Sequence, residues 1–415
     1  MKFGIIAERR TPPERRVVFP PATCKKLMVA FDAQVIVEPS ATRVFSDREY
    51  GELGVRVAYQ MEECDVLLGV KEVPIAHLIP NKKYFFFSHT IKRQPHNKKL
   101  LQMVLERNIE LYDHELLTAP NGRRLVAFGH YAGIVGAYNG IRAFGLKFER
   151  FRLPKAETLP DQHALIGALQ KIRLPAIKIL VTGKGRVGDG IKEILDAMGI
   201  EKIPVADYLK LDYDRPVYCR IDASEYNRRI DGRRGSKADF FAHPRDYKSN
   251  FFRFSKVTDL YMAGHFFSDN GSPALYTHED VRHPDFKIKV VADVSCDVDG
   301  PIATTIRAST IENPIYGYDP RTGRETNFMD PHAIAVMAVD NLPCELPRDA
   351  SVGFGQAFLR NVVPAFFNGD RDGILERARM TKNGKLTPRY SYLQDYVEGT
   401  GDNSIPHSTI HPLSL

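Results

Sequence analysis

The fold is decided by the stretch Ile177-Lys-Ile-Leu-Val-Thr-Gly-Lys-Gly-Arg-Val-Gly-Asp-Gly-Ile-Lys-Glu-Ile-Leu-Asp-Ala-Met-Gly199. Residues 177–181 form a short, mostly apolar run of strand length, and apolar residues recur at helical spacing from 191 to 198. The glycines between them have the spacing GxGxxG. Strand, glycine turn and helix in this order are typical of the dinucleotide-binding fingerprint. The sequence therefore predicts a nucleotide-binding α/β unit.

Each position of the glycine turn has an expected role. Gly183 allows the tight turn, Gly185 lets the backbone approach a pyrophosphate, and Gly188 lets the helix pack on the strand. Arg186 and Val187 occupy the variable positions, and we expect both to contact the cofactor. The free N–H groups at the start of the helix then face the phosphates, aided by the helix dipole.

A carboxylate for the cofactor ribose is predicted at Asp207. Residues 203–207 form the next strand candidate, and Asp207 lies about twenty residues beyond Gly188, where a carboxylate commonly binds the ribose hydroxyls of NAD. Lys210 and Arg215 follow closely and would suit the 2′-phosphate of NADP instead. The sequence thus leaves NAD and NADP open.

Composition bounds the class of protein. With 415 residues and 43% hydrophobic residues, the chain is long enough for two domains and holds no apolar run of membrane-span length. Residues 1–10 bring charge directly after a short apolar run, which predicts a first strand and no signal peptide. Five scattered cysteines have neither a CxxC nor a metal-binding spacing, so we expect unpaired, mostly buried thiols in a reducing cytoplasm and no metal site.

The formal net charge of +7 comes from dispersed basic residues. No nucleic-acid-binding module accompanies the charge, and its densest cluster, residues 228–234, also holds an aspartate. A basic site for multi-anionic metabolites accounts for the excess. We therefore expect small-molecule substrates and neither nucleic acid nor a membrane as partner, with the oligomeric state left open.

Alternating strands and helices predict an α/β fold. Before the glycine turn we expect strands at 3–7, 34–38, 66–70, 84–88 and 110–112, and helices at 22–31, 97–107 and 127–144. The last of these helices is rich in glycine, which permits very close packing. After the turn we expect strands at 258–265 and 288–295, a charged insertion at 208–252, helices at 329–339 and 350–367, and a mobile last dozen residues.

Charged residues gather at the ends of three predicted strands in the N-terminal part. Lys71 and Glu72 follow one strand, His89 follows the very apolar next one, and Glu115 and Arg124 come after the third. In open α/β sheets, ligands bind beyond the carboxyl ends of the strands. The chemistry is therefore expected at these loops.

Two aspartates, Asp293 and Asp297, fall at the end of a later apolar strand. A carboxylate beside a buried strand is costly unless it has partners. We therefore expect at least one of the two to be functional.

Several short motifs run through the chain in a recognisable order. Besides the glycine fingerprint they are Glu14-Arg-Arg16, Gly69-Val-Lys71, Phe86-Phe-Ser-His-Thr-Ile-Lys92, Val126-Ala-Phe-Gly129, Asp293-Val-Ser-Cys-Asp297, Thr310-Ile-Glu312, Asp340-Asn-Leu-Pro343 and Asn383-Gly384. On these motifs the chain resembles the superfamily of alanine dehydrogenase, transhydrogenase and lysine-forming saccharopine dehydrogenase. Within it, the chain looks most like the lysine–ketoglutarate reductase half of the bifunctional lysine-degrading enzyme.

This resemblance implies two Rossmann-like domains, with the nucleotide-binding one inserted into a discontinuous catalytic domain. The expected boundaries are residues 1–140 for the first part of the catalytic domain, 141–330 for the NAD(P)-binding domain, and 331–415 for a return helix and the last part of the catalytic domain.

The resemblance also implies roles for single residues. Lys71 and His89 would flank the reacting carbonyl or imine as an acid–base pair. Arg16 and Arg124 would grip substrate carboxylates with their forked guanidinium groups. The further implied contacts are Glu72 and Glu115 beside the acid–base pair, Asp297 in the active site, and Asp340 at the cofactor.

Three functions are compatible with these patterns. The expected one is interconversion of saccharopine with L-lysine and 2-oxoglutarate by hydride transfer with NAD or NADP, because two arginines suit a substrate with three carboxylates. The alternative is alanine dehydrogenase or a related opine or amino-acid dehydrogenase. A third hypothesis, from another class, is a cofactor-sensing protein without turnover, since a fold alone fixes no substrate.

Overall fold

The computed structural model describes residues 1–267 and 270–399, so the expected mobile C-terminal dozen lies outside the described residues. Contacts divide the chain into two compact units, Met1–Ala127 with Pro347–Leu415 and Phe128–Leu346. The chain thus divides at 127/128 and 346/347, whereas the boundaries expected from the sequence are 140/141 and 330/331. In the described part of the chain, no helix is both long and apolar enough to span a membrane.

The first unit is built on a parallel sheet with the strand order β3-β2-β1-β4-β5-β6. These strands are β1 (Lys2–Ile5), β2 (Gln34–Val37), β3 (Arg56–Val57), β4 (Val66–Leu68), β5 (Lys83–Phe86) and β6 (Glu110–Asp113). The middle strand β4 is buried along its whole length, as in sheets covered on both faces. Because the strands are parallel, the carboxyl ends of β4, β5 and β6 meet at one edge of the sheet.

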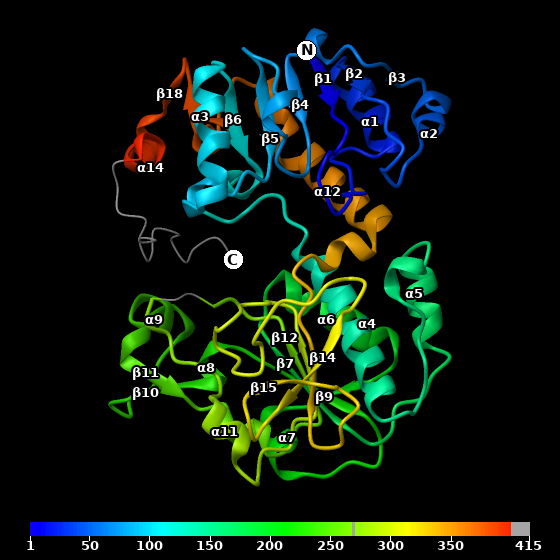
Figure 1. Cartoon of the computed structure of the whole chain (residues 1–415), viewed down its shortest axis with the longest axis vertical. Coiled ribbons are helices and arrows are strands. Elements are labelled where there is room, and N and C mark those ends of the chain that lie inside the picture. Colours follow the sequence, from blue (N-terminus) through cyan, green and yellow to red (C-terminus); the bar gives the residue numbers. More distant parts are fainter. Residues whose placement is uncertain (268–269, 400–415) are drawn as a thin grey trace. The chain divides into compact units, whose positions relative to one another are not determined.

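A C-terminal helix completes the core of this unit. The ring of Phe358 on α12 packs edge-on against Phe19 and Phe85, with ring centroids 5.4 and 6.0 Å apart. Figure 1 shows this orange helix beside the blue and cyan elements of the N-terminal part. The unit's helices and hairpin are α1 (Pro21–Phe31), α2 (Asp47–Glu52), α3 (Lys98–Glu106), α12 (Pro347–Asn361), α13 (Ile374–Ala378), α14 (Gln394–Glu398) and β17 (Thr381–Lys382) with β18 (Lys385–Leu386).

The second unit holds a sheet with the order β15-β14-β16-β13-β12-β7-β9-β8. Its strands are β7 (Lys178–Thr182), β8 (Glu201–Lys202), β9 (Val217–Ile221), β12 (Leu260–Ala263), β13 (Val290–Asp293), β14 (Ile315–Asp319), β15 (Arg324–Thr326) and β16 (Ile334–Met337). Strands β16, β13, β12, β7, β9 and β8 pair in parallel, and β14 and β15 extend the sheet antiparallel beside β16. After β7, the next strands β8 and β9 lie on one side of it in the sheet, and the following strand β12 pairs on its other side. The topological switch point therefore lies between β7 and β12.

Helices α4 (Gly129–Lys147) and α6 (Arg186–Ala197) approach each other through glycines. A Cβ added at Gly133 would lie 2.0 Å from the Val187 carbonyl oxygen, and one at Gly190 would lie 2.0 Å from the His130 carbonyl oxygen. The predicted glycine-rich helix thus packs directly against the helix of the glycine turn. The remaining elements are α5 (Gln162–Leu169), α7 (Val205–Lys210), α8 (Ala223–Tyr226), α9 (Lys237–Ala242), α10 (Phe252–Ser255), α11 (His278–Arg282) and the ribbon of β10 (Asn227–Arg229) with β11 (Tyr247–Ser249).

Three sequence predictions are wrong. Residues 203–207 are not a strand, because Pro204 precedes α7 and suits a helix start, where its missing N–H is not needed. The helix expected at 329–339 is instead the buried inner strand β16, since a short apolar run does not tell a strand from a buried helix. The region 208–252 is not an insertion as a whole, because it contains the inner strand β9; only its later part, with the β10–β11 ribbon, lies outside the main sheet.

Replacing Gly190 with alanine should destabilise the second unit by about 1–3 kcal/mol, because the added methyl group overlaps the α4 backbone. The matched control is Gly167→Ala on α5, where an added Cβ meets no described atom within 4 Å. That control should stabilise by about 0.5–1 kcal/mol, since alanine favours the helix over glycine. Urea unfolding followed by circular dichroism measures both, and equal stability of the two variants would contradict the glycine contact.

Candidate functional site

The glycine turn of the second unit is shaped by close backbone contacts. Gly183 has a φ of +96°, and a Cβ there would lie 2.3 Å from the carbonyl oxygen of Gly264. A Cβ on Gly188 would lie 2.1 Å from the Gly183 carbonyl oxygen. Around Gly185, in contrast, the described residues place no atom within 4 Å of an added Cβ, so the backbone is open to a ligand.

Helix α6 begins at this open position. Gly185 is its N-cap residue and Arg186 its first residue, so the N–H groups that begin the helix lie at the glycine turn. Val187 packs toward the end of β12, because an added Cβ at Gly264 would lie 3.0 Å from its Cγ1. The start of α6 therefore has the geometry of an anion-binding site.

Arg220, on the neighbouring strand β9, binds the backbone of the glycine turn. Its Nε donates to the Gly183 carbonyl oxygen at 2.8 Å, and its Nη2 lies 2.8 Å from the Asp189 carboxylate. The sequence reading missed this residue, because Arg220 acquires its place only when β9 pairs with β7.

Asp222, and not Asp207, ends the strand beside β7. Asp207 lies on α7, whereas Asp222 follows Ile221, whose carbonyl oxygen accepts the Gly183 N–H at 2.9 Å. The Asp222 carboxylate also caps α8 by accepting the Ser224 N–H at 3.1 Å. The position expected for the ribose carboxylate therefore belongs to Asp222.

Two further predicted residues lie at the same edge of this sheet. Asp297 is half-buried in the loop after β13, and Asp340 is exposed after β16. The neighbouring Asp293 is fully buried and accepts hydrogen bonds from Ser295 and Thr305 at 2.6 and 2.7 Å. Burial raises the pKa of Asp293, and its partners fix the loop that carries Asp297.

In the first unit, His89 lies between two carboxylates. Its Nε2 is 4.0 Å from Glu72, and its Nδ1 is 3.7 Å from Glu115. Glu72 also faces Arg10 at 3.5 Å.

Glu115 is the charged centre of this group. Lys92 and Arg124 lie 3.7 and 3.5 Å from its Oε1, whereas Arg123 is exposed. Burial alone would raise the pKa of Glu115, but contact with His89 and the charges of Lys92 and Arg124 lower it well below its usual range. Glu115 is therefore ionised at neutral pH, and Arg124 rather than Arg123 belongs to the site.

Arg16 is buried and already paired. Its Nε and Nη2 contact the two carboxylate oxygens of Glu14 at 2.8 and 2.7 Å, and both residues are 3% exposed. Burial opposes the negative charge of Glu14, but Arg16 lowers the pKa of this carboxyl, and the charge of nearby Lys71 acts in the same direction. Lys71 therefore lies within electrostatic reach of this pair.

The backbone that carries Lys71 is held from two sides. The Glu8 carboxylate accepts the N–H groups of Val70 and Lys71 at 2.6 and 3.1 Å, and the His114 ring lies 2.9 Å from the Gly69 carbonyl oxygen. Burial raises the pKa of Glu8 to about 8 and lowers that of His114 to about 4. Sequence reasoning assigned no role to either residue, since their partners are backbone groups.

Asp113 at the end of β6 was likewise missed. Its carboxylate accepts hydrogen bonds from the Ser88 hydroxyl at 2.6 Å and from the N–H groups of His89 and Glu115 at 3.2 and 2.8 Å. A fully buried aspartate after an apolar strand was the available signal.

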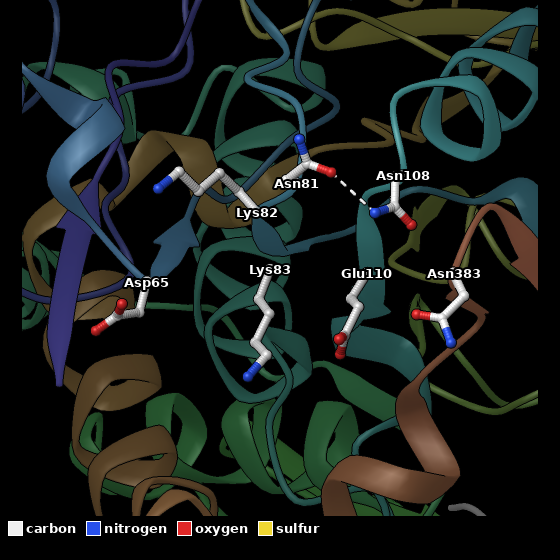
Figure 2. Close-up of a pocket in the computed structure, with 7 residues that line it drawn as sticks. All are labelled: Asp65, Asn81, Lys82, Lys83, Asn108, Glu110 and Asn383. Atoms are coloured by element: carbon white, nitrogen blue, oxygen red, sulfur yellow. Dashed lines mark hydrogen bonds between the residues drawn. The ribbon is translucent and has the colours of Figure 1, made fainter.

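A polar pocket of about 260 Å³ lies at the opposite edge of this sheet. Figure 2 shows its lining, with Asp65 before β4 and with Lys83 and Glu110 as the first residues of β5 and β6. Asn108 donates to Asn81 there at 2.8 Å. The pocket sits at the amino ends of the strands and is separate from the His89 group.

The fold and these features define a class, a mixed α/β chain of the Rossmann type with a glycine-rich strand–turn–helix and a cluster of charged side chains at the strand ends. Residues 4–135 match the family of the alanine dehydrogenase/PNT N-terminal domain. A solved L-alanine dehydrogenase is similar in fold at a TM-score of 0.64 and 16% identity, covering 96% of this chain and 100% of that one. A transhydrogenase from Sinorhizobium meliloti has a TM-score of 0.58 at 16% identity, covering 93% of this chain and 100% of that one.

The chain is also similar to curated relatives in sequence. Alpha-aminoadipic semialdehyde synthase of Arabidopsis thaliana is 26% identical over 94% of this chain and 41% of its own length. A saccharopine dehydrogenase (NAD(+), L-lysine-forming) of Yarrowia lipolytica is 25% identical over 88% of this chain and 92% of its own length. The chain spans less than half of the synthases and most of the dehydrogenase. The resemblance seen in the motifs is thereby confirmed.

Replacing His114 should reduce the pH dependence of stability. The pKa of His114 falls from 6.5 to about 4 on folding, so the unfolded state binds more protons between these values and stability is lost as pH falls. At 1.36 kcal/mol per unit, the gap in unfolding free energy between wild type and His114→Gln should grow by about 3 kcal/mol from pH 4 to pH 7. Urea titrations at both pH values test this, with the exposed His243→Gln as control; a constant gap would contradict a neutral buried ring.

Proposed function

We propose that this chain is an oxidoreductase that interconverts saccharopine with L-lysine and 2-oxoglutarate, using NAD as cofactor. The observation that carries the proposal is His89 held between Glu72 and Glu115, at the sheet edge that also bears Lys71 and Arg124. Similarity to lysine-forming saccharopine dehydrogenases over 84–90% of this chain supports it. In this proposal the first unit binds the substrates and the second binds the cofactor.

The proposed chemistry requires several proton transfers at one carbon. The amine of lysine adds to the oxo group of 2-oxoglutarate, water leaves, and the resulting imine is reduced. Lys71 and His89 would divide these transfers, because each follows a strand at the same edge of the sheet. Glu72 and Glu115 lie 4.0 and 3.7 Å from the two ring nitrogens of His89 and would hold the ring in place.

The arginines would hold the substrate carboxylates. Arg124 is half-buried beside Glu115 and offers a forked donor to one of them. The guanidinium plane of Arg16 is fixed by Glu14, and Arg16 is the proposed partner of a second substrate carboxylate. The paired carboxylates keep both arginines from forming an uncompensated positive cluster.

The second unit would hold the dinucleotide. Gly183, Gly185 and Gly188, with the first turn of α6, would bind the pyrophosphate, and Asp222 would accept hydrogen bonds from the adenosine ribose. Asp297 and Asp340 are proposed to line the same carboxyl edge. When bound, the nicotinamide supplies or takes the hydride.

The test is absorbance of NADH and NADPH with L-lysine and 2-oxoglutarate. Oxidation that requires both substrates supports the proposal. Turnover with pyruvate and ammonia alone would instead favour an alanine-type dehydrogenase. Tight binding of NADH without turnover on a panel of oxo acids and amines would favour the cofactor-sensing protein.

Lys71→Met should lower kcat at least about 100-fold, because a proton-transfer group is lost. The affinity for NADH, measured by its fluorescence, should change less than about twofold, since the change lies in the other compact unit. Lys99→Met on the exposed side of α3 is the matched control and should leave kcat unchanged. A parallel loss of NADH affinity in Lys71→Met would contradict the proposed role.

Asp222→Ser should lower the preference for NADH over NADPH about tenfold, because the carboxylate that repels a 2′-phosphate is removed. Serine retains an oxygen that caps α8, so the fold is kept. Asp207→Ser on α7 is the control and should leave the ratio of the two dissociation constants unchanged. If the ratio changed for Asp207→Ser and not for Asp222→Ser, Asp207 would be the residue that binds the ribose.

A further inference from the structure

A buried histidine ends the strand on the other side of the glycine turn. His265 follows β12 and is 6% exposed. Its Nδ1 lies 2.9 Å from the Thr182 hydroxyl, and the same hydroxyl lies 2.9 Å from the Tyr261 hydroxyl. The Nε2 of His265 is buried and has no hydrogen-bond partner among the described residues. A buried polar atom of this kind costs free energy unless a ligand satisfies it.

The direction of the hydrogen bonds between Tyr261, Thr182 and His265 determines whether Nε2 of His265 is a donor or an acceptor. If Tyr261 donates to Thr182, the Thr182 proton is free to be donated to Nδ1, and every hydroxyl proton has an acceptor. In the reverse order, no described residue is left to accept the phenol proton of Tyr261. The first order places the imidazole proton on Nε2. Burial lowers the pKa of His265 to about 4, so the ring is neutral at neutral pH and Nε2 is a donor.

His265 belongs to the turn by its backbone as well. Its own N–H nitrogen would lie 2.9 Å from a Cβ added at Gly183, and a Cβ at Gly264 would lie 3.2 Å from the Gly188 nitrogen. Thr182 and Gly264 continue neighbouring strands, β7 and β12, between which the strand order reverses. The unsatisfied donor thus lies at the switch point, where a dinucleotide crosses such a sheet.

We propose that Nε2–H of His265 donates a hydrogen bond to an acceptor oxygen of the nicotinamide-ribosyl half of the dinucleotide. A doubly wound sheet consists of two mononucleotide-binding halves. The half with β7 and β9 carries the glycine turn and Asp222, whereas β12 begins the other half. The proposal rests on the dinucleotide binding that is part of the proposed function. Tyr261 and Thr182 act as positioning residues that hold the ring in the donor form.

The first test compares NADH with AMP, which lacks the nicotinamide half. For His265→Leu we expect NADH to bind about tenfold more weakly and AMP to bind within about twofold of wild type. His265→Gln keeps a side-chain N–H and should recover most of the loss. Unchanged NADH affinity in His265→Leu overturns this inference alone, and so does an equal loss for AMP. A wild-type chain that binds no NADH overturns the proposed function together with it.

The second test is read in the wild-type protein, so its result does not depend on how well a variant folds. In wild-type protein labelled with ¹⁵N-histidine, the Nε2 signal of His265 should move when NADH saturates the chain and should stay in place with AMP. The signal is assigned by its absence in His265→Gln. The ring of Tyr226, with its centroid 5.9 Å from that of His265, is the weaker internal partner. An Nε2 signal that does not respond to NADH assigns the donor to that ring and overturns the inference.

Discussion

The first unit depends on one buried carboxylate. Asp113 receives N–H groups from both His89 and Glu115, so a single residue sets the backbone of the two side chains that face each other. His89 has a φ of +53°, a left-handed conformation that is uncommon outside glycine and costs free energy. The hydrogen bonds to Asp113 offset this strain, and they also satisfy a charge that would otherwise be costly to bury. The position of the imidazole therefore follows from the end of β6.

At the same edge of the sheet, carboxyl groups differ in pKa because their surroundings differ. Burial and the negative charge of Glu115 raise the pKa of Asp113, and burial raises that of Glu8. Glu115 is buried as well, but cations around it lower its pKa. Groups whose environments push their pKa values apart can serve as acid and base at one pH. The carboxyl groups at this edge of the first unit thus differ in proton affinity because their surroundings differ.

The sequence predicted helices and strands better than it predicted which single residues lie at the two candidate sites. The glycine turn and the strands that precede Lys71 and His89 were predicted correctly, because a strong apolar period and glycine spacing are local signals. Asp207 was expected at the end of a strand because the apolar run around Pro204 resembles one. The strand that pairs with β7 is instead β9, and Asp222 follows it. Glu8, Asp113 and Arg220 were missed for another reason. Their partners are backbone groups brought close only by strand pairing, and no spacing in the sequence records them.

The two units handle charge by different means. In the second, backbone N–H groups at the start of α6 lie beside an open glycine, an arrangement that favours an anion without charged side chains. In the first, charge is held by side chains such as Glu115 and Arg124, whose identity determines which carboxylates and amines fit. Backbone recognition tolerates sequence change as long as glycines and helix start remain. This difference is consistent with solved structures at 16% identity sharing the fold, because a fold alone does not fix a substrate.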